Sequence, residues 1–243
     1  MTDQHTHILP GMDDGSRSLE MSLELLRAEA IQGVNTVILT PHYYRTRESG
    51  AHFLERRSLA FEKLSEAILA LPEEDLRGLP SLVLGAEVAW APDLIECSHL
   101  PELCFTGTQA FLLELPMAPW HNSLLVHIRD LMTATGLMPV IAHIDRYWSS
   151  QKPELLKELF SMGLPIQLSA DTLLHFSTRG KALKALLSGQ VRYLMSDCHD
   201  PRYRKPNLGD ALQIVEKKLG ADMRRRLESE TDSLMKKYAL EKV

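Results

Sequence analysis

The sequence has 243 residues, of which 44% are hydrophobic and 24% are charged, and its formal net charge is −5 at pH 7. This composition is typical of a globular protein, and the acidic balance argues against general binding to nucleic acid or to an anionic membrane. Three cysteines without a C-x-x-C pair argue against a disulfide framework and fit a reducing compartment. The sequence shows neither a basic-then-apolar leader nor an apolar run of about 18 residues, so a cytoplasmic protein without a membrane span is expected.

Short apolar or β-branched runs alternate with longer stretches of helical periodicity along the chain. The predicted strands are Asp3–His7, Thr36–Thr40, Ser81–Leu84, Ala110–Glu114, Met138–Ala142, Pro165–Ser169 and Arg192–Ser196. The predicted helices run from Leu19 to Ala30, with Ser18 as N-cap and Gly33 as stop, and over Phe53–Leu71, Ser123–Thr135, Pro153–Met162, Gly180–Leu187, Asn207–Leu219 and Asp222–Tyr238. Seven strand–helix units predict a single α/β domain over residues 1–243, with parallel strands that form a closed or nearly closed TIM-like barrel.

The first predicted strand carries the first sign of a metal site. His5 and His7 are two residues apart, so both side chains face the same side of a strand and can hold one cation. A Pro-Gly turn and the segment Asp13-Asp14-Gly15 follow, and we expect the turn to bring a carboxylate back near the strand. An H-x-H pair alone is weak evidence, because exposed or hydrogen-bonded histidines are common. The other predicted strands therefore have to supply further ligands.

Residue types that bind metals lie at the ends of most other predicted strands. In α/β barrels the chemistry takes place at the carboxyl ends of the strands, which meet on one rim. The candidate ligands on this rim are His5, His7, Asp14, His42, Glu87, Glu114, His143, Asp197 and His199. Carboxylates are not buried together unless cations compensate their charge. Nine nitrogen and oxygen ligands exceed the needs of one ion, so the set predicts two or three divalent ions, and mixed imidazole and carboxylate ligands suit manganese, iron or zinc. The remaining histidines, predicted to be surface or core residues, are His52, His99, His121, His127 and His175.

A cluster of divalent ions favours hydrolysis, and phosphate esters are its natural substrates. Arg146 and Arg204 each follow a candidate ligand closely, and an arginine can bind phosphate through two hydrogen bonds. Cys198 and Arg204 also fit the C-x5-R pattern of cysteine-dependent tyrosine phosphatases. Pro201 removes a backbone donor from that loop and Asp200 would repel the anion, so the metal-dependent mechanism is favoured.

Six motifs occur in order between residues 3 and 204: Asp-x-His-x-His-Ile-Leu-Pro-Gly-x-Asp-Asp-Gly, Thr-Pro-His-Tyr, Gly-Ala-Glu, Leu-Glu, Ala-His-x-x-Arg-Tyr and Ser-Asp-x-His. Together they resemble the polymerase and histidinol phosphatase (PHP) superfamily. Within it, the chain resembles the bacterial manganese-dependent tyrosine-protein phosphatases of capsular and exopolysaccharide synthesis. Asp200 stands where that pattern has an Asn, and the loop Tyr43–His52 is distinctive.

The resemblance implies a distorted seven-stranded (β/α) barrel with three metal ions. It assigns His5, His7, Glu87 and Asp197 to one ion; Glu87, Glu114 and His143 to a second; and Asp14, His42 and His199 to a third. A metal-bridging hydroxide would attack phosphorus while Arg146 and Arg204 hold the phosphate. The implied substrate is phosphotyrosine in the tail of a cognate tyrosine kinase.

Other functions fit the sequence less well. A PHP-type histidinol phosphatase or another small-molecule phosphoesterase is the closest alternative. An amidohydrolase also begins with an H-x-H pair, but it usually offers a carboxylated lysine on strand four, where this chain has Glu114. The modest acidity and the lack of an aromatic–basic patch argue against a nuclease. The non-enzyme alternative is a catalytically silent binding partner of a polysaccharide-synthesis kinase complex. The sequence leaves the physiological substrate and the oligomeric state open.

Overall fold

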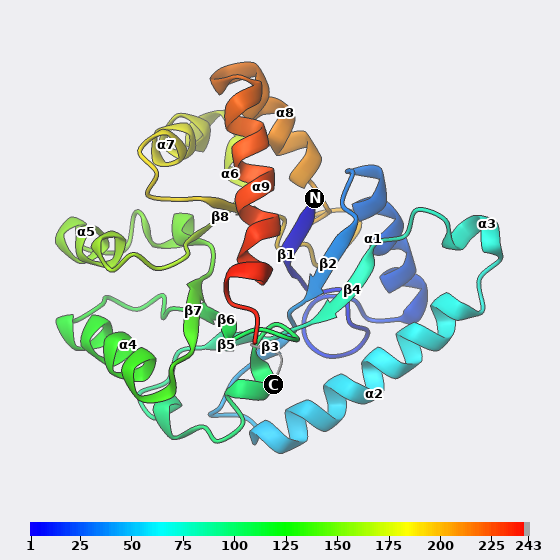
Figure 1. Ribbon diagram of the computed structural model, residues 1–243, viewed down its shortest axis with the longest axis horizontal. Helices are drawn as coiled ribbons and strands as arrows, with labels where there is room; N and C mark the ends of the chain where they lie inside the picture. The colour runs from blue at the N-terminus through cyan, green and yellow to red at the C-terminus, as the bar shows by residue number, and fades with distance from the viewer. Residues whose placement is uncertain (241–243) are drawn as a thin grey trace.

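The computed structural model describes residues 1–240, in which parallel strands lie at the centre and helices surround them (Figure 1). The strands are β1 (Thr2–Thr6), β2 (Thr36–Leu39), β3 (His42–Tyr43), β4 (Ser81–Leu84), β5 (Glu87–Ala89), β6 (Ala110–Glu114), β7 (Met138–Ile141), β8 (Gln167–Ser169) and β9 (Tyr193–Met195). The α-helices are α1 (Leu19–Ile31), α2 (Gly50–Leu69), α3 (Glu73–Leu76), α4 (Asn122–Thr135), α5 (Pro153–Ser161), α6 (Asp171–Leu174), α7 (Phe176–Leu187), α8 (Leu208–Leu219) and α9 (Ala221–Lys237). Three 3-10 helices complete the described elements: η1 (Leu94–Glu96), η2 (Pro101–Leu103) and η3 (Ile144–Tyr147).

The strands pair in three parallel sheets, in the orders β1-β2-β4, β3-β5-β6-β7 and β8-β9. Two isolated parallel bridges join neighbouring sheets, one between Thr6 and Cys198 and one between Ile141 and Ile166. The architecture is therefore a mixed α/β fold with parallel sheets, and the sequence prediction is confirmed at this level. Within residues 1–240, no helix combines the length and the apolar character needed to cross a membrane.

Two short strands that the sequence did not predict, β3 and β5, follow predicted strands closely. The predicted strand Thr36–Thr40 is β2, which ends at Leu39 because Pro41 has no backbone N–H to continue the ladder, and β3 begins at His42. The predicted strand Ser81–Leu84 is β4, which ends before Gly85, where a Cβ atom would lie 2.8 Å from the Phe105 ring, and β5 begins at Glu87. These breaks place His42 directly opposite Glu87 in the β3–β5 register.

Some helix limits also differ from the sequence predictions for physical reasons. Helix α2 begins three residues earlier than predicted, because the Ser49 side chain accepts a hydrogen bond from the backbone N–H of His52 and caps the helix. Helix α7 begins at Phe176, although Gly180 suggested a later start. The predicted cap of α1 is confirmed, since the Ser18 side chain accepts a hydrogen bond from the Met21 N–H.

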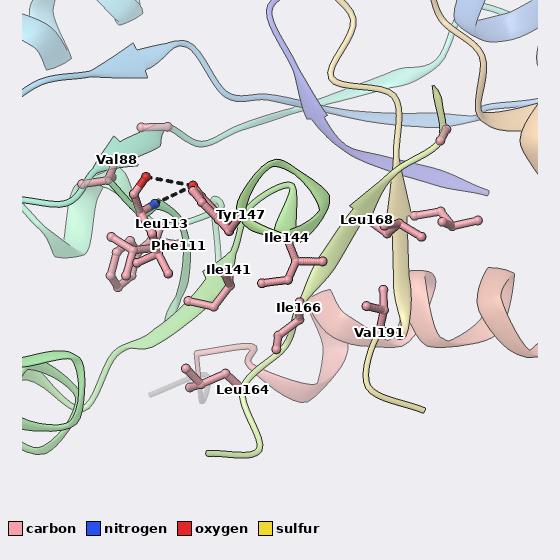
Figure 2. Packing of buried hydrophobic residues seen from close by; sticks show 14 of the residues in the cluster. Val88, Phe111, Leu113, Ile141, Ile144, Tyr147, Leu164, Ile166, Leu168 and Val191 are labelled. Atoms are coloured by element: carbon pink, nitrogen blue, oxygen red, sulfur yellow. Dashed lines mark hydrogen bonds between the residues drawn. The ribbon is translucent and has the colours of Figure 1, made fainter. Parts of the chain in front are cut away.

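The apolar core fills the space between the strands and the helices. Val88, Phe111, Ile141 and Leu168 are fully buried side chains that extend from different strands into this core (Figure 2). Burial of each such side chain stabilises the fold by about 1.5–3 kcal/mol. Tyr147 adds a polar tie, because its hydroxyl donates to the Leu115 carbonyl at 2.8 Å and accepts from the Leu115 N–H at 3.0 Å. This tie holds η3 against the end of β6, so the residues that follow β6 and β7 lie side by side.

Candidate metal and phosphate site

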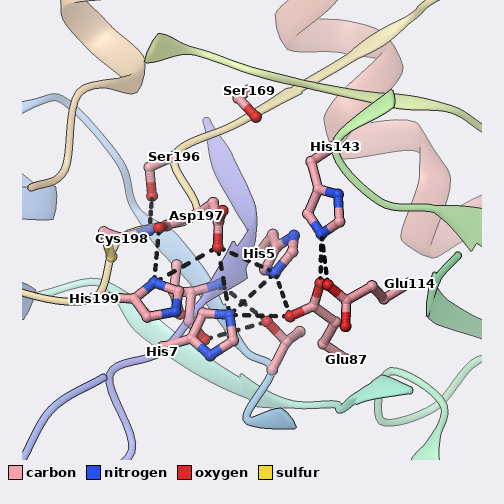
Figure 3. A network of polar contacts seen from close by, with 12 residues as sticks. His5, His7, Glu87, Glu114, His143, Ser169, Ser196, Asp197, Cys198 and His199 are labelled. Atoms are coloured by element: carbon pink, nitrogen blue, oxygen red, sulfur yellow. Dashed lines mark hydrogen bonds and ion pairs between the residues drawn. The ribbon is translucent and has the colours of Figure 1, made fainter. Parts of the chain in front are cut away.

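The carboxyl ends of the strands converge on a buried cluster of imidazoles and carboxylates (Figure 3). His5 lies on β1 and His7 just beyond it, while Glu87 begins β5 and Glu114 ends β6. The segments after β7 and β9 supply the rest of the labelled cluster, namely His143, Asp197 and His199. The structure thus brings together residues that are far apart in the sequence.

Glu87 is the centre of this cluster. Its Oε2 atom lies 3.1 Å from His5 Nε2, 3.3 Å from His7 Nε2 and 2.9 Å from His42 Nδ1. Its Oε1 atom lies 2.8 Å from His143 Nε2, which is also 3.6 Å from Glu114 Oε1. Four imidazoles therefore surround one carboxylate that is almost completely removed from water.

The side chains fall into three groups that could each hold a cation. The groups are His7, Asp14, His42 and His199; His5, His7 and Glu87; and His42, Glu87 and Glu114. Within each group, one ligand atom per residue lies within 4.8 Å of all the others. All nine candidate ligands lie in this region, because Asp197 Oδ1 is 3.4 Å from both His5 and His7, and His143 contacts Glu87.

Within residues 1–240, several buried atoms of the cluster have no partner in hydrogen-bonding geometry, although Glu87 Oε2 and His42 Nδ1 lie 2.9 Å apart. They are Glu87 Oε2, His42 Nδ1, His199 Nε2, His5 Nδ1 and His143 Nδ1. A buried polar atom without a partner destabilises a protein by about 1–3 kcal/mol. Glu87 Oε2 and His199 Nε2 are atoms through which carboxylates and imidazoles commonly bind metals, and a cation among them would satisfy both.

The charges of the cluster also fit a cation. Burial alone would raise the pKa of Glu87, but the electrostatic interaction with His5 and hydrogen bonds from neighbouring imidazoles hold that pKa well below its ordinary value, so the carboxylate is ionised. Asp197 behaves in the same way, since burial is outweighed by His5 and His7 and its pKa is also well below the ordinary value. Burial and the charge of His7 lower the pKa of His199 to about 4, so its imidazole is neutral, the form that binds metals.

Asp13 is an important residue of the site that the sequence did not single out. Its Oδ2 atom accepts hydrogen bonds from His7 Nδ1 at 2.7 Å and from the His42 N–H at 2.9 Å. Oδ1 accepts the Gly15 N–H at 2.9 Å. A carboxylate bonded to one imidazole nitrogen fixes the ring and leaves the other nitrogen for a metal. Gly15 permits this turn, because a Cβ atom there would lie 2.2 Å from the His7 carbonyl oxygen.

The backbone is strained at two candidate ligands. His143 has φ of 27° and Asp197 has φ of 54°, and within residues 1–240 no other non-glycine residue has positive φ. Such conformations cost about 1–3 kcal/mol each and persist where the surroundings impose them, commonly at functional sites. The strain directs both side chains toward Glu87 and His5 (Figure 3).

Two arginines lie beside the cluster. The Nη2 atoms of Arg146 and Arg204 donate to the same oxygen, Asp197 Oδ2, at 2.5 and 2.7 Å. About one third of each side chain remains exposed, so the guanidinium groups are accessible. Asp200 orders the segment before Arg204, because its carboxylate accepts the backbone N–H groups of Arg202, Tyr203 and Arg204.

These same bonds are incompatible with a cysteine-dependent mechanism. That mechanism requires a thiolate and free backbone N–H groups around the phosphate, whereas here three N–H groups of the loop are bound to Asp200. Cys198 is completely buried, and its Sγ lies 3.3 Å from Glu29 Oε1. Burial and the nearby carboxylates raise the pKa of the Cys198 thiol well above its ordinary value, so it remains protonated.

The remaining five histidines do not join the groups that could hold a cation. His52 and His99 lie near Glu48 and Glu102, respectively, and His127 stacks on Trp90. His175 pairs with Asp171 at 3.0 Å and lines a cavity next to the arginines.

Comparison with known proteins decides the family. The family model for capsular polysaccharide synthesis, CpsB/CapC, matches residues 1–235. The chain belongs to the CpsB/CapC family. The resemblance stated from the sequence motifs is therefore confirmed, since this family agrees with the capsular branch of PHP-type enzymes.

Relatives of this CpsB/CapC family member match over almost their whole length. The tyrosine-protein phosphatase YwqE of Bacillus subtilis is 28% identical in an alignment of 252 residues, gaps included. The alignment covers 99% of this chain and 93% of YwqE. The tyrosine-protein phosphatase CpsB of Streptococcus agalactiae serotype III is 27% identical over 237 residues, which cover 93% of this chain and 94% of CpsB.

Solved structures give the same picture for this family member. A chain from a crystallographic study of YwqE from Bacillus subtilis and CpsB from Streptococcus pneumoniae, described as metal-dependent tyrosine phosphatases, superposes with a TM-score of 0.83 and 25% identity. The match covers 99% of this chain and 96% of that one. A D-hydantoinase superposes with a TM-score of 0.50 at 11% identity, which is a likeness of fold alone.

Proposed function

We propose that this chain is a metal-dependent phosphomonoesterase that hydrolyses phosphotyrosine in proteins. The observation that carries this proposal is the buried cluster around Glu87, whose unpartnered ligand atoms lie beside two accessible arginines. The similarity to the tyrosine-protein phosphatases CpsB and YwqE supports the choice of phosphotyrosine.

The proposed cofactor is two or three divalent ions, manganese in preference to iron or zinc. His5, His7, Glu87 and Asp197 would hold one ion; Glu87, Glu114 and His143 a second; and Asp14, His42 and His199 a third. The donor set fits, because it mixes imidazole with carboxylate and contains buried atoms that lack any other partner. When bound, such ions supply an activated water and stabilise the charge on the phosphoryl oxygens.

The residues of this chain would position the substrate. Arg146 and Arg204 would bind the phosphate, and Asp197 aligns them because both guanidinium groups donate to the same oxygen. Asp13 would fix the ring of His7. The leaving group is a phenolate, which departs more readily than an alkoxide, so the reaction does not require a dedicated general acid.

We further propose that residues 1–243 form a single PHP-type domain whose strands close into a distorted seven-stranded barrel. In this description β2 and β3 count as one strand, and so do β4 and β5. The bridges Thr6–Cys198 and Ile141–Ile166 support closure, because they connect the three sheets.

The proposed partner is a phosphotyrosine-bearing protein of capsular polysaccharide synthesis, and the tail of a bacterial tyrosine kinase is the specific candidate. The proposed location is the cytoplasm. The description of the family supports the link to capsule synthesis.

Hydrolysis of a phosphotyrosyl peptide tests the proposal. Activity should disappear after chelation and return with manganese. Removal of a residue that only supports a metal ligand lowers activity by up to about 100-fold. His143 is a proposed ligand itself, so His143→Ala should lower kcat/KM by more than that. His121→Ala is the matched control, because His121 is exposed and outside the cluster. Activity in protein shown to be free of metal would overturn the proposal.

A further inference from the structure

A polar cavity of about 250 Å³ adjoins the two arginines. Arg146 and Arg204 line it together with residues that follow β7, β8 and β9, among them Tyr203, Lys205 and Asn207. Ser169, at the end of β8, also lines the cavity and lies apart from the imidazole cluster (Figure 3). Strand β8 contributes no candidate metal ligand, so the residues at its end can contact a substrate instead.

The carboxylates of the cavity already have partners. Asp145 accepts hydrogen bonds from the Ser169 N–H at 2.9 Å and from the Ser169 hydroxyl at 3.0 Å. Asp171 pairs with His175, and Asp197 pairs with both arginines. Lys205 is exposed and, within the part of the chain that the structure describes, makes no ion pair. Among the described residues, Lys205 is therefore the charged side chain of this cavity that has neither an ion pair nor a hydrogen bond.

A second observation indicates a ligand with hydrogen-bond donors. Asn207 lines the cavity and is only 6% exposed, yet its Oδ1 atom has no hydrogen-bond partner among residues 1–240. Tyr203, by contrast, is 92% exposed, while its backbone N–H is fixed by Asp200. This pair suits an extended peptide, because a peptide offers side chains that can contact the Tyr203 ring and N–H groups that can donate to the Asn207 amide oxygen.

We propose that this cavity is a second substrate subsite, which binds the polypeptide next to the phosphotyrosine and selects an acidic side chain there. Lys205 pairs with the acidic side chain, and the Asn207 amide binds the peptide main chain. Arg146 and Arg204 belong to both the phosphate site and this cavity, so one peptide can reach both. The inference rests on the proposed phosphotyrosine phosphatase function and names a sequence preference for it.

Binding measurements test the subsite independently of turnover. The probes are fluorescent peptides that carry a non-hydrolysable phosphonate analogue of phosphotyrosine, with either glutamates or alanines at the two positions on each side. Dissociation constants are measured by fluorescence anisotropy on the manganese-loaded protein at low salt. The variants are Lys205→Ala and, as a matched control, Lys63→Ala, because Lys63 is exposed on α2 and does not line the cavity.

The wild-type protein should bind the glutamate peptide about two- to fivefold more tightly than the alanine peptide, the range of an exposed ion pair. Lys205→Ala should bring this ratio close to one, whereas Lys63→Ala should preserve it. Asn207→Ala should weaken both peptides by a similar factor, with its melting temperature measured alongside. A wild-type ratio of one, a ratio that survives in Lys205→Ala, or no binding of either peptide would overturn the subsite.

Hydrolysis of the ordinary phosphotyrosyl alanine peptide separates the two proposals. Selective binding without hydrolysis would overturn the phosphatase function and leave the subsite supported. Hydrolysis without selective binding would do the opposite.

Discussion

Replacement of Asp13 by Asn tests whether a residue outside the proposed ligand set controls metal binding. Asp13 Oδ2 accepts two hydrogen bonds, from His7 Nδ1 at 2.7 Å and from the His42 N–H at 2.9 Å. An Asn amide group in that position would face two donors with a donor of its own. If the side chain flips, it loses the Gly15 N–H bond instead. In the first orientation, the ring of His7 would no longer be held by this side chain.

Loss of such a partner weakens metal binding by about 10–100-fold, or about 1.4–2.8 kcal/mol. We therefore expect a 10–100-fold higher manganese concentration for half-maximal activity in Asp13→Asn, measured in chelator-buffered solutions. The melting temperature of the metal-free protein reports separately on the lost hydrogen bonds, which are worth about 1 kcal/mol each. Asp75→Asn serves as the control, since Asp75 is exposed on α3. An unchanged manganese requirement in Asp13→Asn would refute the reasoning.

Four other substitutions examine the site and its support. Cys198→Ser should retain phosphatase activity because the buried thiol is not the nucleophile, and complete loss of turnover with metals still bound would contradict this. Gly15→Ala should lower the melting temperature and weaken metal binding, because the new Cβ would lie 2.2 Å from the His7 carbonyl oxygen. Gly180→Ala is the control, because its new Cβ would have no atom within 4 Å, and it should stabilise α7 by about 0.5–1 kcal/mol. If both glycine variants changed the melting temperature equally, the packing described around Gly15 would be contradicted. Arg57→Ala should reduce the free energy of unfolding, measured in urea, by about 3 kcal/mol, because buried Arg57 donates to the carbonyls of Gly85 and Glu102. A change below about 1 kcal/mol would argue that these hydrogen bonds do not stabilise the fold.

Sequence spacing was informative wherever one local rule determined geometry. The alternation of side chains along a strand predicted that His5 and His7 face the same space, and the structure places their Nε2 atoms 3.1 Å apart. The rule that polar residues of a barrel meet at the carboxyl ends of its strands was enough to collect His143 and Asp197 near them. Both relationships depend only on the period of a strand and the direction of the chain.

Other features depended on tertiary contacts that no local pattern records. The sequence singled out Asp14 and not Asp13, but the turn at Gly15 brings Asp13 to His7 and leaves Asp14 exposed to solvent. The break before Glu87 follows from the packing of Gly85 against Phe105, which lies twenty residues further along the chain. The unpartnered Asn207 amide was also invisible, because absence of a partner is a property of the folded protein.

The order of the cluster residues along the chain has a consequence for biosynthesis. The cluster begins at His5 and ends at His199, and helix α9, which follows, packs on β1 through the bond from Gln4 Nε2 to the Thr231 carbonyl. A nascent chain therefore lacks a complete cluster until His199 has been translated, and β1 gains the cover of α9 later still. A chain that terminates before His199 could not assemble the cluster, so it could not remove phosphate from its substrate.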